Sequence, residues 1–237
     1  TFAGGFAGYL ARTNDTSFEN MKNAVIYGST LASFCVEKFG TERMESLKFE
    51  EVQQRLEQFK ELMSAAITAV RSNANDTKIM VHFAGIEGSD WFFNQVSVLD
   101  YDIIGLSYYP KWHGKSLNGL QLKMKQLSAA HQKPIVIAET AYPFTLGWND
   151  WTNNIIGEED QLILPEYPAT IEGQRRFIKQ IHMLTKEIEN GLGFCYWGAE
   201  LISWKGNEST EASPWENQAL FDFDNKALPV LGEFNTE

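Results

Sequence analysis

Apolar residues recur in the second part of the chain in short continuous runs, and polar and aromatic residues follow each run. The runs cover 79–83, 103–108, 135–137 and 193–197. Such runs are typical of strands that are buried on both faces of a parallel sheet. Segments with helical spacing separate them, near 91–98, 117–131 and 170–189. This alternation predicts an α/β fold, either a doubly wound sheet or part of a barrel.

The first part of the chain has a helical pattern instead. A small apolar run with Gly4, Gly5 and Gly8 leads into a helix, and a second helix begins near Ser17 and stops at Gly40. Small residues around Gly28 would let another element approach the second helix closely. Residues 47–71 predict one long helix, and acidic residues at its start favour the positive end of the helix dipole. We therefore expect an α-helical segment before the strands.

Glu139 stands where the third apolar run ends. Pro134 opens that run, which suits the first residue of a strand, because proline has no N–H to give to a sheet. In α/β barrels the carboxyl ends of the strands carry the chemistry, so a carboxylate there is a catalytic candidate. If Glu139 has a structural role instead, its carboxylate would pair with a neighbouring arginine or cap the next helix.

Aromatic and histidine side chains follow all four runs. The candidates for substrate binding are His82, Tyr108, Trp112, His113, Tyr142, Trp148, Trp197 and Trp204. Taken singly, each aromatic residue also suits core packing. His82 suits a core imidazole or a partner that orients a carboxylate, and His113 suits contact with substrate, with a structural ion or with its own loop. A carboxylate in an aromatic cleft is typical of glycoside hydrolysis.

Composition narrows the classes of partner. A formal charge of -11 and an isoelectric point near 4.9 argue against nucleic-acid binding but not against a neutral polysaccharide. The two cysteines, Cys35 and Cys195, lie in apolar runs and are expected to be buried free thiols. An acidic loop over 149–160 suits a structural calcium ion or a solvated run of charge. No cofactor, zinc spacing or membrane span is indicated.

The beginning of the chain resembles a known family. The runs Thr1–Phe6, Ala24–Ser29 and Ala32–Gly40 are similar to the C-terminal tail of ribokinase-like (PfkB-type) sugar kinases. The resemblance covers residues 1–60, and the chain begins just after the point where the catalytic Asp of that family would stand. We expect a kinase remnant there, so the chain has the character of a fragment or a chimera, without a signal peptide.

Residues 61–237 resemble a second family, the family-53 glycoside hydrolases, which are arabinogalactan endo-β-1,4-galactanases. The resemblance rests on Asp100–Pro110 with Trp112-His113-Gly114, on Ile137–Pro143, on Tyr167–Thr170, and on Gly193–Trp197 with Ser213–Asp222. It implies the C-terminal half of a TIM (β/α)8 barrel, with about four parallel strands. It also implies a retaining mechanism on β-1,4-galactan or a related plant polysaccharide, with Glu139 as the nucleophile.

The same resemblance implies that a catalytic group is missing. In that family the acid/base Glu follows an Asn at the end of the fourth strand, which this chain lacks. The Asn207-Glu208 pair follows no apolar strand and is a poor substitute. We therefore expect little or no hydrolysis by this chain alone. The alternatives are a non-catalytic sugar-binding fragment and a half barrel that self-associates through its open sheet edges. The galactanase-like part suggests export and the kinase-like part suggests the cytoplasm.

Overall fold

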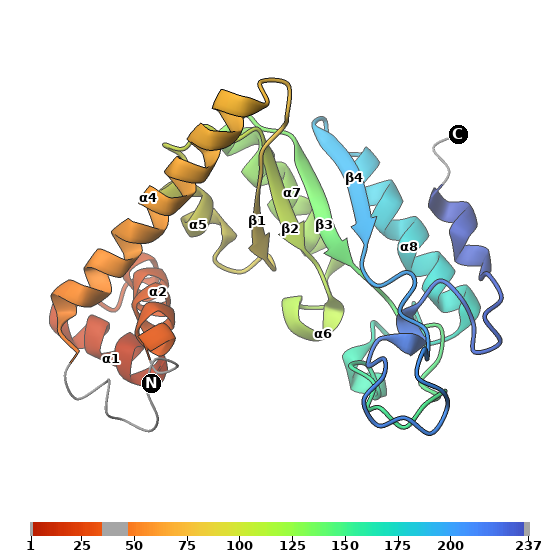
Figure 1. Ribbon diagram of the computed structural model, residues 1–237. Coiled ribbons are helices and arrows are strands. Elements are labelled where there is room, and N and C mark those ends of the chain that lie inside the picture. The colour runs from red at the N-terminus through yellow and green to blue at the C-terminus, as the bar shows by residue number, and fades with distance from the viewer. Residues whose placement is uncertain (1, 35–46, 235–237) are drawn as a thin grey trace. The chain divides into compact units, whose positions relative to one another are not determined.

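The computed structural model describes residues 2–34 and 47–234. Gly40 and Cys35, on which two expectations rest, lie outside these residues. The chain divides into two compact units: one comprises residues 1–77 and 94–100, and the other comprises residues 78–93 and 101–237. Figure 1 shows helices in the first unit and a sheet with helices in the second. Each unit is described by itself.

The first unit begins with two helices, α1 (Phe2–Thr13) and α2 (Phe18–Phe34). They pack closely: a Cβ atom added to Gly5 would lie 2.8 Å from the Cα atom of Gly28. The rings of Tyr9 and Tyr27 stack with their centroids 4.3 Å apart. The prediction that small residues on the second helix admit a close neighbour is confirmed at Gly28.

The long helix predicted over 47–71 is α4 (Phe49–Asn73). Glu51 accepts a hydrogen bond from the backbone N–H of Lys48 at 2.9 Å, which satisfies one of the free donors at the start of the helix. At the other end, the guanidinium of Arg71 donates to the carboxylate of Asp100 at 2.8 Å and to the carbonyl of Thr77 at 3.1 Å. These bonds tie the end of α4 to the segments that follow it.

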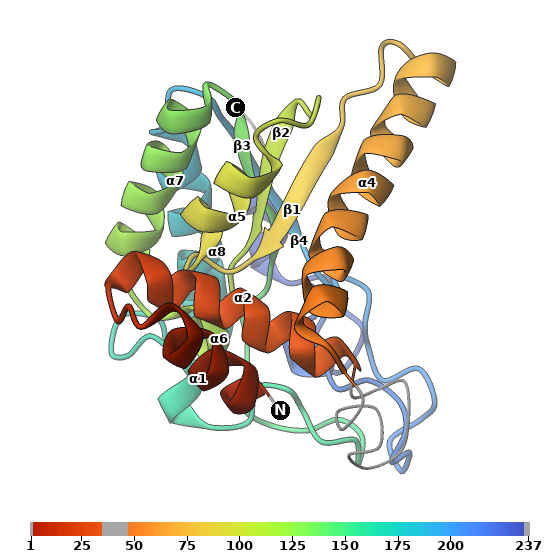
Figure 2. The same ribbon diagram turned by 90° about the vertical axis from the view of Figure 1, so that its left-hand side faces the viewer.

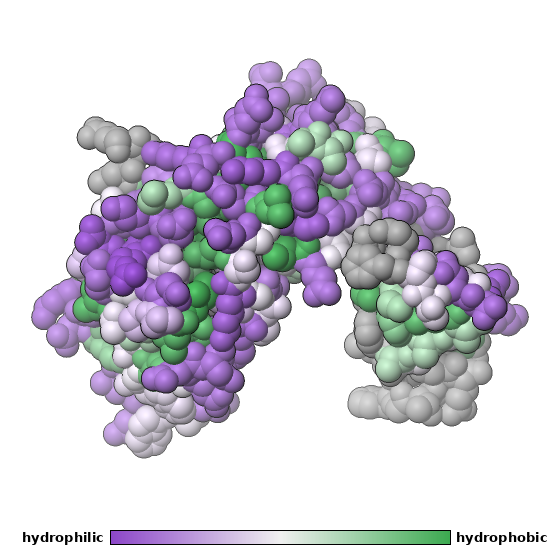
Figure 3. Space-filling view, turned by 180° about the vertical axis from the view of Figure 1, so that it is seen from behind, coloured by the Kyte–Doolittle hydropathy of each residue, from purple (hydrophilic) through white to green (hydrophobic). Residues whose placement is uncertain are grey.

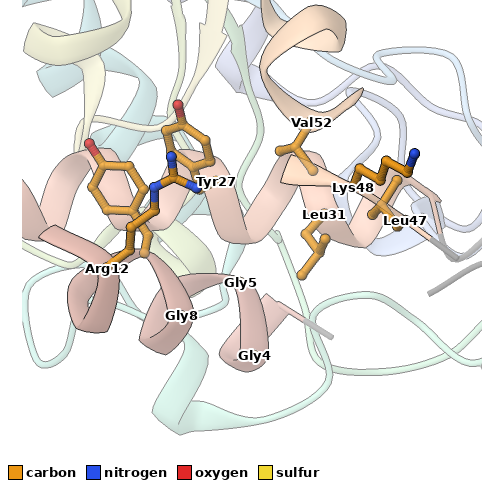
Figure 4. Close-up of a pocket in the computed structure, with 10 residues that line it drawn as sticks. Gly4, Gly5, Gly8, Arg12, Tyr27, Leu31, Leu47, Lys48 and Val52 are labelled. Carbon is orange, nitrogen blue, oxygen red and sulfur yellow. The ribbon is translucent and has the colours of Figure 1, made fainter. Parts of the chain in front are cut away.

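A hollow of about 250 Å³ lies between α1, α2 and α4 of the first unit. Figure 4 shows that its side chains come from different helices, with Tyr27 and Leu31 on α2 and Val52 on α4. The glycine-rich backbone of α1 forms another wall, because Gly4 and Gly8 have no side chain to fill the space.

The second unit contains one sheet of four parallel strands in the order β1-β2-β3-β4. The strands are β1 (Met80–Ala84), β2 (Ile103–Ser107), β3 (Ile135–Thr140) and β4 (Gly191–Tyr196). Between them lie α5 (Ser89–Val96), α6 (Pro110–His113), α7 (Leu117–His131) and α8 (Ile171–Lys186). Strand order that follows chain order is the arrangement of a barrel, so the structure supports part of a barrel rather than a doubly wound sheet.

Helices cover one face of this sheet, as Figures 1 and 2 show for α7 and α8. The side chains beneath them form the core: Ile104, Leu106, Ile135 and Ile137 are fully buried. On the opposite face Met80 is 44% exposed. The register shift that pairs Ile135 with Gly191 and Ile137 with Phe194 leaves one extra residue in β4, so Leu192, which is 56% exposed, also lies on that face. Seen from behind, the outer surface of the helices is mainly hydrophilic (Figure 3).

The expectation that Cys195 is a buried thiol is wrong. Cys195 is a free thiol with an exposed side chain. Its neighbour Phe194 packs against His182 of α8 and against Phe234. Because successive side chains of a strand point to opposite faces, Cys195 lies on the face that the helices do not cover.

Long loops and short 3₁₀ helices complete the second unit. The 3₁₀ helices are η2 (Glu159–Gln161), η3 (Glu216–Gln218) and η4 (Pro229–Phe234). Among the described helices, none combines the length and the apolar character that crossing a bilayer requires.

Candidate active site

Glu139 lies at the carboxyl end of β3, as predicted. It is the partner of Ser107 on β2, just after a register shift between the two strands. Its backbone carbonyl accepts the N–H of Tyr108 at 2.8 Å, which fixes the end of the strand. The side chain is half-buried, and its Oε2 atom accepts a hydrogen bond from the hydroxyl of Tyr109 at 3.2 Å. The carboxylate is therefore held by a phenol and still reaches the surface.

Tyr109 was not among the predicted site residues. Its side chain is only 6% exposed. Burial raises the pKa of its phenol, and the negative charge and hydrogen bond of Glu139 raise that pKa further. The phenol therefore keeps its proton and remains a hydrogen-bond donor to Glu139 at every physiological pH.

Tyr109 contacts two tryptophans, Trp112 and Trp215, and Trp215 contacts a third, Trp197. We call these four residues the aromatic cluster. The ring of Tyr109 lies 5.4 Å from Trp112 and 5.7 Å from Trp215, measured between centroids. Trp215 also lies 6.4 Å from both Trp112 and Trp197. Because Trp112 is 49% exposed and Trp197 is 45% exposed, flat apolar surface is available beside the carboxylate.

The two candidate histidines have different surroundings. His82 on β1 is exposed, and its Nε2 atom lies 2.8 Å from the hydroxyl of Ser107. The core-imidazole alternative for His82 is therefore wrong. His113 is half-buried, and its Nδ1 atom accepts the backbone N–H of Tyr109 at 3.0 Å. This bond makes His113 a cap on its own loop, which was one of the alternatives left open by the sequence.

Tyr108 and Tyr142, which were candidates for substrate binding, are buried core residues, the alternative that the sequence left open. Tyr108 is fully buried, and its hydroxyl donates to the carbonyl of Gly114 at 2.7 Å. Tyr142 is 1% exposed and stacks on Phe177 at 4.1 Å, with its hydroxyl bonded to the carbonyl of Tyr167. Burial raises the pKa of Tyr142 to about 12. Both phenols donate to backbone carbonyls inside the protein, so neither side chain is available for contact with substrate.

Trp148 and Trp204 lie on exposed loops after β3 and β4 and are 53% and 66% exposed. These loops are joined by hydrogen bonds, a feature that we call the loop clasp (residues 144–156 and 209–218). The N–H of Trp151 donates to Ser209, and the N–H of Ile155 donates to Pro214. The side chain of Asn217 donates to the carbonyls of Thr145 and Ile156 at 2.9 and 2.7 Å. The clasp holds both loops at the end of the sheet that carries Glu139.

Two carboxylates are buried in the loop clasp, and each is 1% exposed. Glu216 accepts the backbone N–H groups of Asn149 and Asp150 at 2.6 and 3.2 Å. Burial raises the pKa of Glu216 more than these bonds lower it. For Asp150, burial also raises the pKa, but hydrogen bonds from Thr152 and Ser213 outweigh it and lower the pKa overall. Asp150 is thus not part of a solvated charge run.

Replacing Glu216 tests this arrangement. The raised pKa means that its contribution to stability is present below pH 4.5 and is lost as the pH rises through the pKa of the folded state. We expect Glu216→Gln to raise the melting temperature at pH 7.5 by about 2 °C, since the amide oxygen still accepts both N–H groups and no charge is buried. Glu216→Ala should lower stability by about 2 kcal/mol, because both donors lose their partner. Calorimetry in EDTA at pH 4.5 and 7.5 measures the stability of both variants. Equal losses of stability in Glu216→Gln and Glu216→Ala would contradict this account.

No group of three or more His, Cys, Asp or Glu side chains forms a metal-binding cluster in the part of the chain that the structure describes. The site therefore consists of one carboxylate with a phenol donor, bordered by indole rings. A carboxylate of this kind suits nucleophilic attack on an anomeric carbon, and the aromatic cluster suits the apolar faces of sugar rings.

Known proteins resemble this chain in sequence and in fold. The Glycosyl hydrolase family 53 profile matches residues 36–234. An uncharacterized protein from Niallia circulans, named for its position in the bgaB 5' region, is 38% identical over 180 residues, covering 73% of this chain and 49% of that protein. The arabinogalactan endo-beta-1,4-galactanase of Cellvibrio japonicus is 35% identical over 186 residues, covering 74% and 49%. The Ignisphaera aggregans GH53 catalytic domain superposes with a TM-score of 0.70 at 38% identity, covering 75% and 51%.

The chain spans about half the length of the curated relatives that it matches. The profile match begins at residue 36, and the second compact unit begins at residue 78. The expected boundary near residue 60 stays a prediction, since it coincides with neither. The resemblance to sugar kinases was predicted over residues 1–60, but the family-53 profile match already covers residues 36–60. For residues 1–35, which lie outside that match, the kinase resemblance stays a prediction.

Proposed function

Because this chain belongs to glycosyl hydrolase family 53, we propose that it carries the nucleophile of a retaining endo-β-1,4-galactanase. The substrate class is β-1,4-galactan or arabinogalactan, as the names of the galactanase relatives suggest. One observation carries the proposal: Glu139 lies at the carboxyl end of a barrel strand with its Oε2 atom bonded to Tyr109, inside the aromatic cluster.

In the proposed reaction, Glu139 attacks the anomeric carbon and forms a covalent glycosyl-enzyme while the glycosidic bond breaks and its oxygen takes a proton from a general acid. The same group then takes a proton from water, which releases the bound sugar from Glu139. The hydroxyl of Tyr109 holds the carboxylate through Oε2 and leaves Oε1 for the attack. Trp112 and Trp197 present exposed faces on which galactose rings stack. The reaction uses carboxylates and water, so it requires no cofactor.

Retaining hydrolysis needs a second carboxyl group about 5–5.5 Å from the nucleophile. We propose that this acid/base group belongs to the portion of the family barrel that the present chain does not cover. The four strands described are half of the eight in a closed barrel. The chain by itself is then a weak catalyst or an inactive one.

Retention in native gels that contain galactan tests the proposal without requiring catalysis. We expect galactan to slow the chain, and we expect Trp112→Ala together with Trp197→Ala to remove most of that retardation. Carboxymethyl cellulose, whose sugar stereochemistry differs at C4, should retard the chain less. Equal mobility with and without galactan would contradict the assignment of the substrate class.

A second candidate function is a non-catalytic fragment that binds sugar or self-associates. The observation that favours it is the uncovered sheet face, on which Met80 and Leu192 are exposed, together with edge strands β1 and β4 that each pair on one side. Unpaired edges are templates for pairing with another chain. We expect a dimer in light scattering at micromolar concentration and a shift to monomer in Leu192→Lys; a monomer at all concentrations would contradict self-association.

The structural calcium ion expected near the acidic loop is proposed for the loop clasp. The Oε2 atom of Glu216 and the Oδ1 atom of Asn217 are buried without a hydrogen-bond partner among the described residues, and such oxygens are the ligands that calcium prefers. Calcium should raise the melting temperature of the chain but not that of Glu216→Gln, and no shift in either protein would count against the ion. The sugar-kinase resemblance of the first residues ranks third. Nucleotide binding by the chain, measured by calorimetry, would support it, and the absence of binding would count against it.

A further inference from the structure

The loop that carries Tyr109 is closed by a histidine. Tyr109 is the N-cap of the four-residue helix α6, and its own side chain makes no capping bond. The backbone N–H of His113 donates to the carbonyl of Tyr109 at 2.9 Å, and the Nδ1 atom of His113 accepts the N–H of Tyr109 at 3.0 Å. In a capping box, a Glu or Gln in the first turn reaches back to the N-cap N–H in the same way. Here an imidazole takes the place of that carboxylate or amide.

The end of β1 holds the imidazole ring in place. Gly85 has a φ of +89°, and a Cβ atom built on it would lie 2.8 Å from the Cδ2 atom of His113. The N–H of Gly85 donates to the carbonyl of Ser107 at 3.0 Å, so the glycine cannot move freely away from the ring. The ring of His113 also lies 6.0 Å from that of Tyr109. The imidazole of His113 is therefore in contact with Gly85, just after β1, and lies beside the phenol of Tyr109.

The hydrogen bond to Tyr109 fixes the charge state of His113. Because Nδ1 accepts, the single ring proton must lie on Nε2, and the imidazole must be neutral. Burial lowers the pKa of His113, whereas the negative charge of Glu139 acts in the opposite direction and is outweighed. The other ionisable groups beside the ring are the phenol of Tyr109 and, on the same helix, Lys111, whose ammonium donates to the carbonyl of Ile155 at 2.5 Å.

We propose that His113 is a positioning residue that acts on Glu139 through Tyr109. Its neutral imidazole holds the backbone of Tyr109 so that the phenol hydroxyl meets the Oε2 atom of Glu139. Protonation of Nδ1 converts the acceptor into a donor that faces another N–H, and the bond breaks. The phenol then leaves the carboxylate and the aromatic cluster. The effect of this release on sugar binding rests on the proposed function, but the release itself does not.

The direction of the pH dependence follows from the lowered pKa. A base whose pKa is lower in the folded state contributes stability above its ordinary value of 6.5 and loses it as the pH falls. The loop is therefore expected to be closed at neutral pH and to open under acid conditions.

Nuclear magnetic resonance of the ¹⁵N-labelled chain measures the protonation of His113 and the response of the Tyr109 amide directly. We expect the Nδ1 resonance of His113 to have the shift of an unprotonated nitrogen at pH 7.5. It should titrate with a midpoint below 6.5, and the amide signal of Tyr109 should move with the same midpoint. His113→Gln offers an amide oxygen that does not titrate, so its Tyr109 signal should resemble the wild type at pH 7.5 and lose the midpoint. A protonated Nδ1 atom at pH 7.5, or a Tyr109 signal that is the same in His113→Ala, would overturn the proposal.

A matched pair of glycine variants gives a second test that leaves the histidine intact. Gly85→Ala should push the ring away and reproduce the Tyr109 shift of His113→Ala. Gly114→Ala introduces the same strain at a φ of +85° but meets no atom within 4 Å, so it should leave Tyr109 in place. Displacement by both glycine variants or by neither would overturn the proposal.

Galactan retention separates this inference from the proposed function. If the chain binds galactan, the dissociation constant should rise about tenfold between pH 7.5 and 4.5 in the wild type, which corresponds to the loss of one hydrogen bond to a charged group. It should change less in His113→Gln. Linked titration of His113 and Tyr109 in a chain that binds no galactan would refute the proposed function and leave the positioning role standing. An equal change with pH in the wild type and in His113→Gln would overturn the effect on sugar binding.

Discussion

Glu139→Gln is expected to abolish the galactan hydrolysis that appears when this chain is joined to the portion of the Cellvibrio japonicus galactanase that it does not cover. The joined protein would have eight strands and a second carboxyl group, and reducing sugar would be released from galactan. Glutamine keeps the shape of Glu139 and its bond to Tyr109 but cannot act as a nucleophile. We expect a loss of about 10⁶-fold in turnover, the scale seen when a nucleophile is removed from an enzyme.

The unjoined chain is the control for this prediction, and it should release no reducing sugar above background. Glu200→Gln is a matched variant, because Glu200 is a second carboxylate at the end of the sheet that carries Glu139, and it is exposed. It should keep the activity of the joined protein. Strong hydrolysis by the unjoined chain would show that the chain supplies its own acid/base group, and the missing-acid proposal would then fail.

Trp215→Ala is expected to weaken galactan binding by about 30-fold, which is close to 2 kcal/mol and typical of a central aromatic anchor. Trp215 is the residue of the aromatic cluster that contacts all three others. Its loss would remove a sugar platform and also the support for Trp112 and Trp197. Isothermal titration calorimetry with galactan-derived oligosaccharides measures the change in affinity.

Phe59→Ala is the control for that experiment. Phe59 is 48% exposed in the first unit, so its replacement removes a similar exposed ring at a place that the proposal does not use. Its affinity for the oligosaccharides should equal that of the wild type. Equal losses in the two variants would mean that the effect of Trp215→Ala is not specific to the site.

The sequence predicted the elements of the second unit well, because their patterns are local. The third apolar run contains Ile135 and Ile137, which are buried against the helices, and it places Glu139 at the strand end without knowledge of any other segment. The helix expected over 117–131 is α7 (Leu117–His131). A strand and a helix each reveal their type through a period within about ten residues.

The sequence did not reveal which of two adjacent tyrosines belongs to the site. Tyr108 and Tyr109 follow the same strand, and the choice between them depends on the turn into α6. The structure buries Tyr108 against Gly114 and directs Tyr109 to Glu139. Trp215 and Glu216 were missed for a different reason: they approach the site through the loop clasp, from about 75 residues further along the chain, and no local period encodes such a contact.

The central claim is that Glu139 forms the covalent bond to the sugar. The most direct measurement is mass spectrometry of the joined protein after incubation with a 2-fluoro galactobioside that carries a dinitrophenolate leaving group. Such a leaving group needs no protonation, and the fluorine slows the release of the sugar by water. We predict one added 2-fluorogalactobiosyl mass on the peptide that contains Glu139, and none in Glu139→Gln. A label on any other carboxylate, or continued turnover without a label, would contradict this claim.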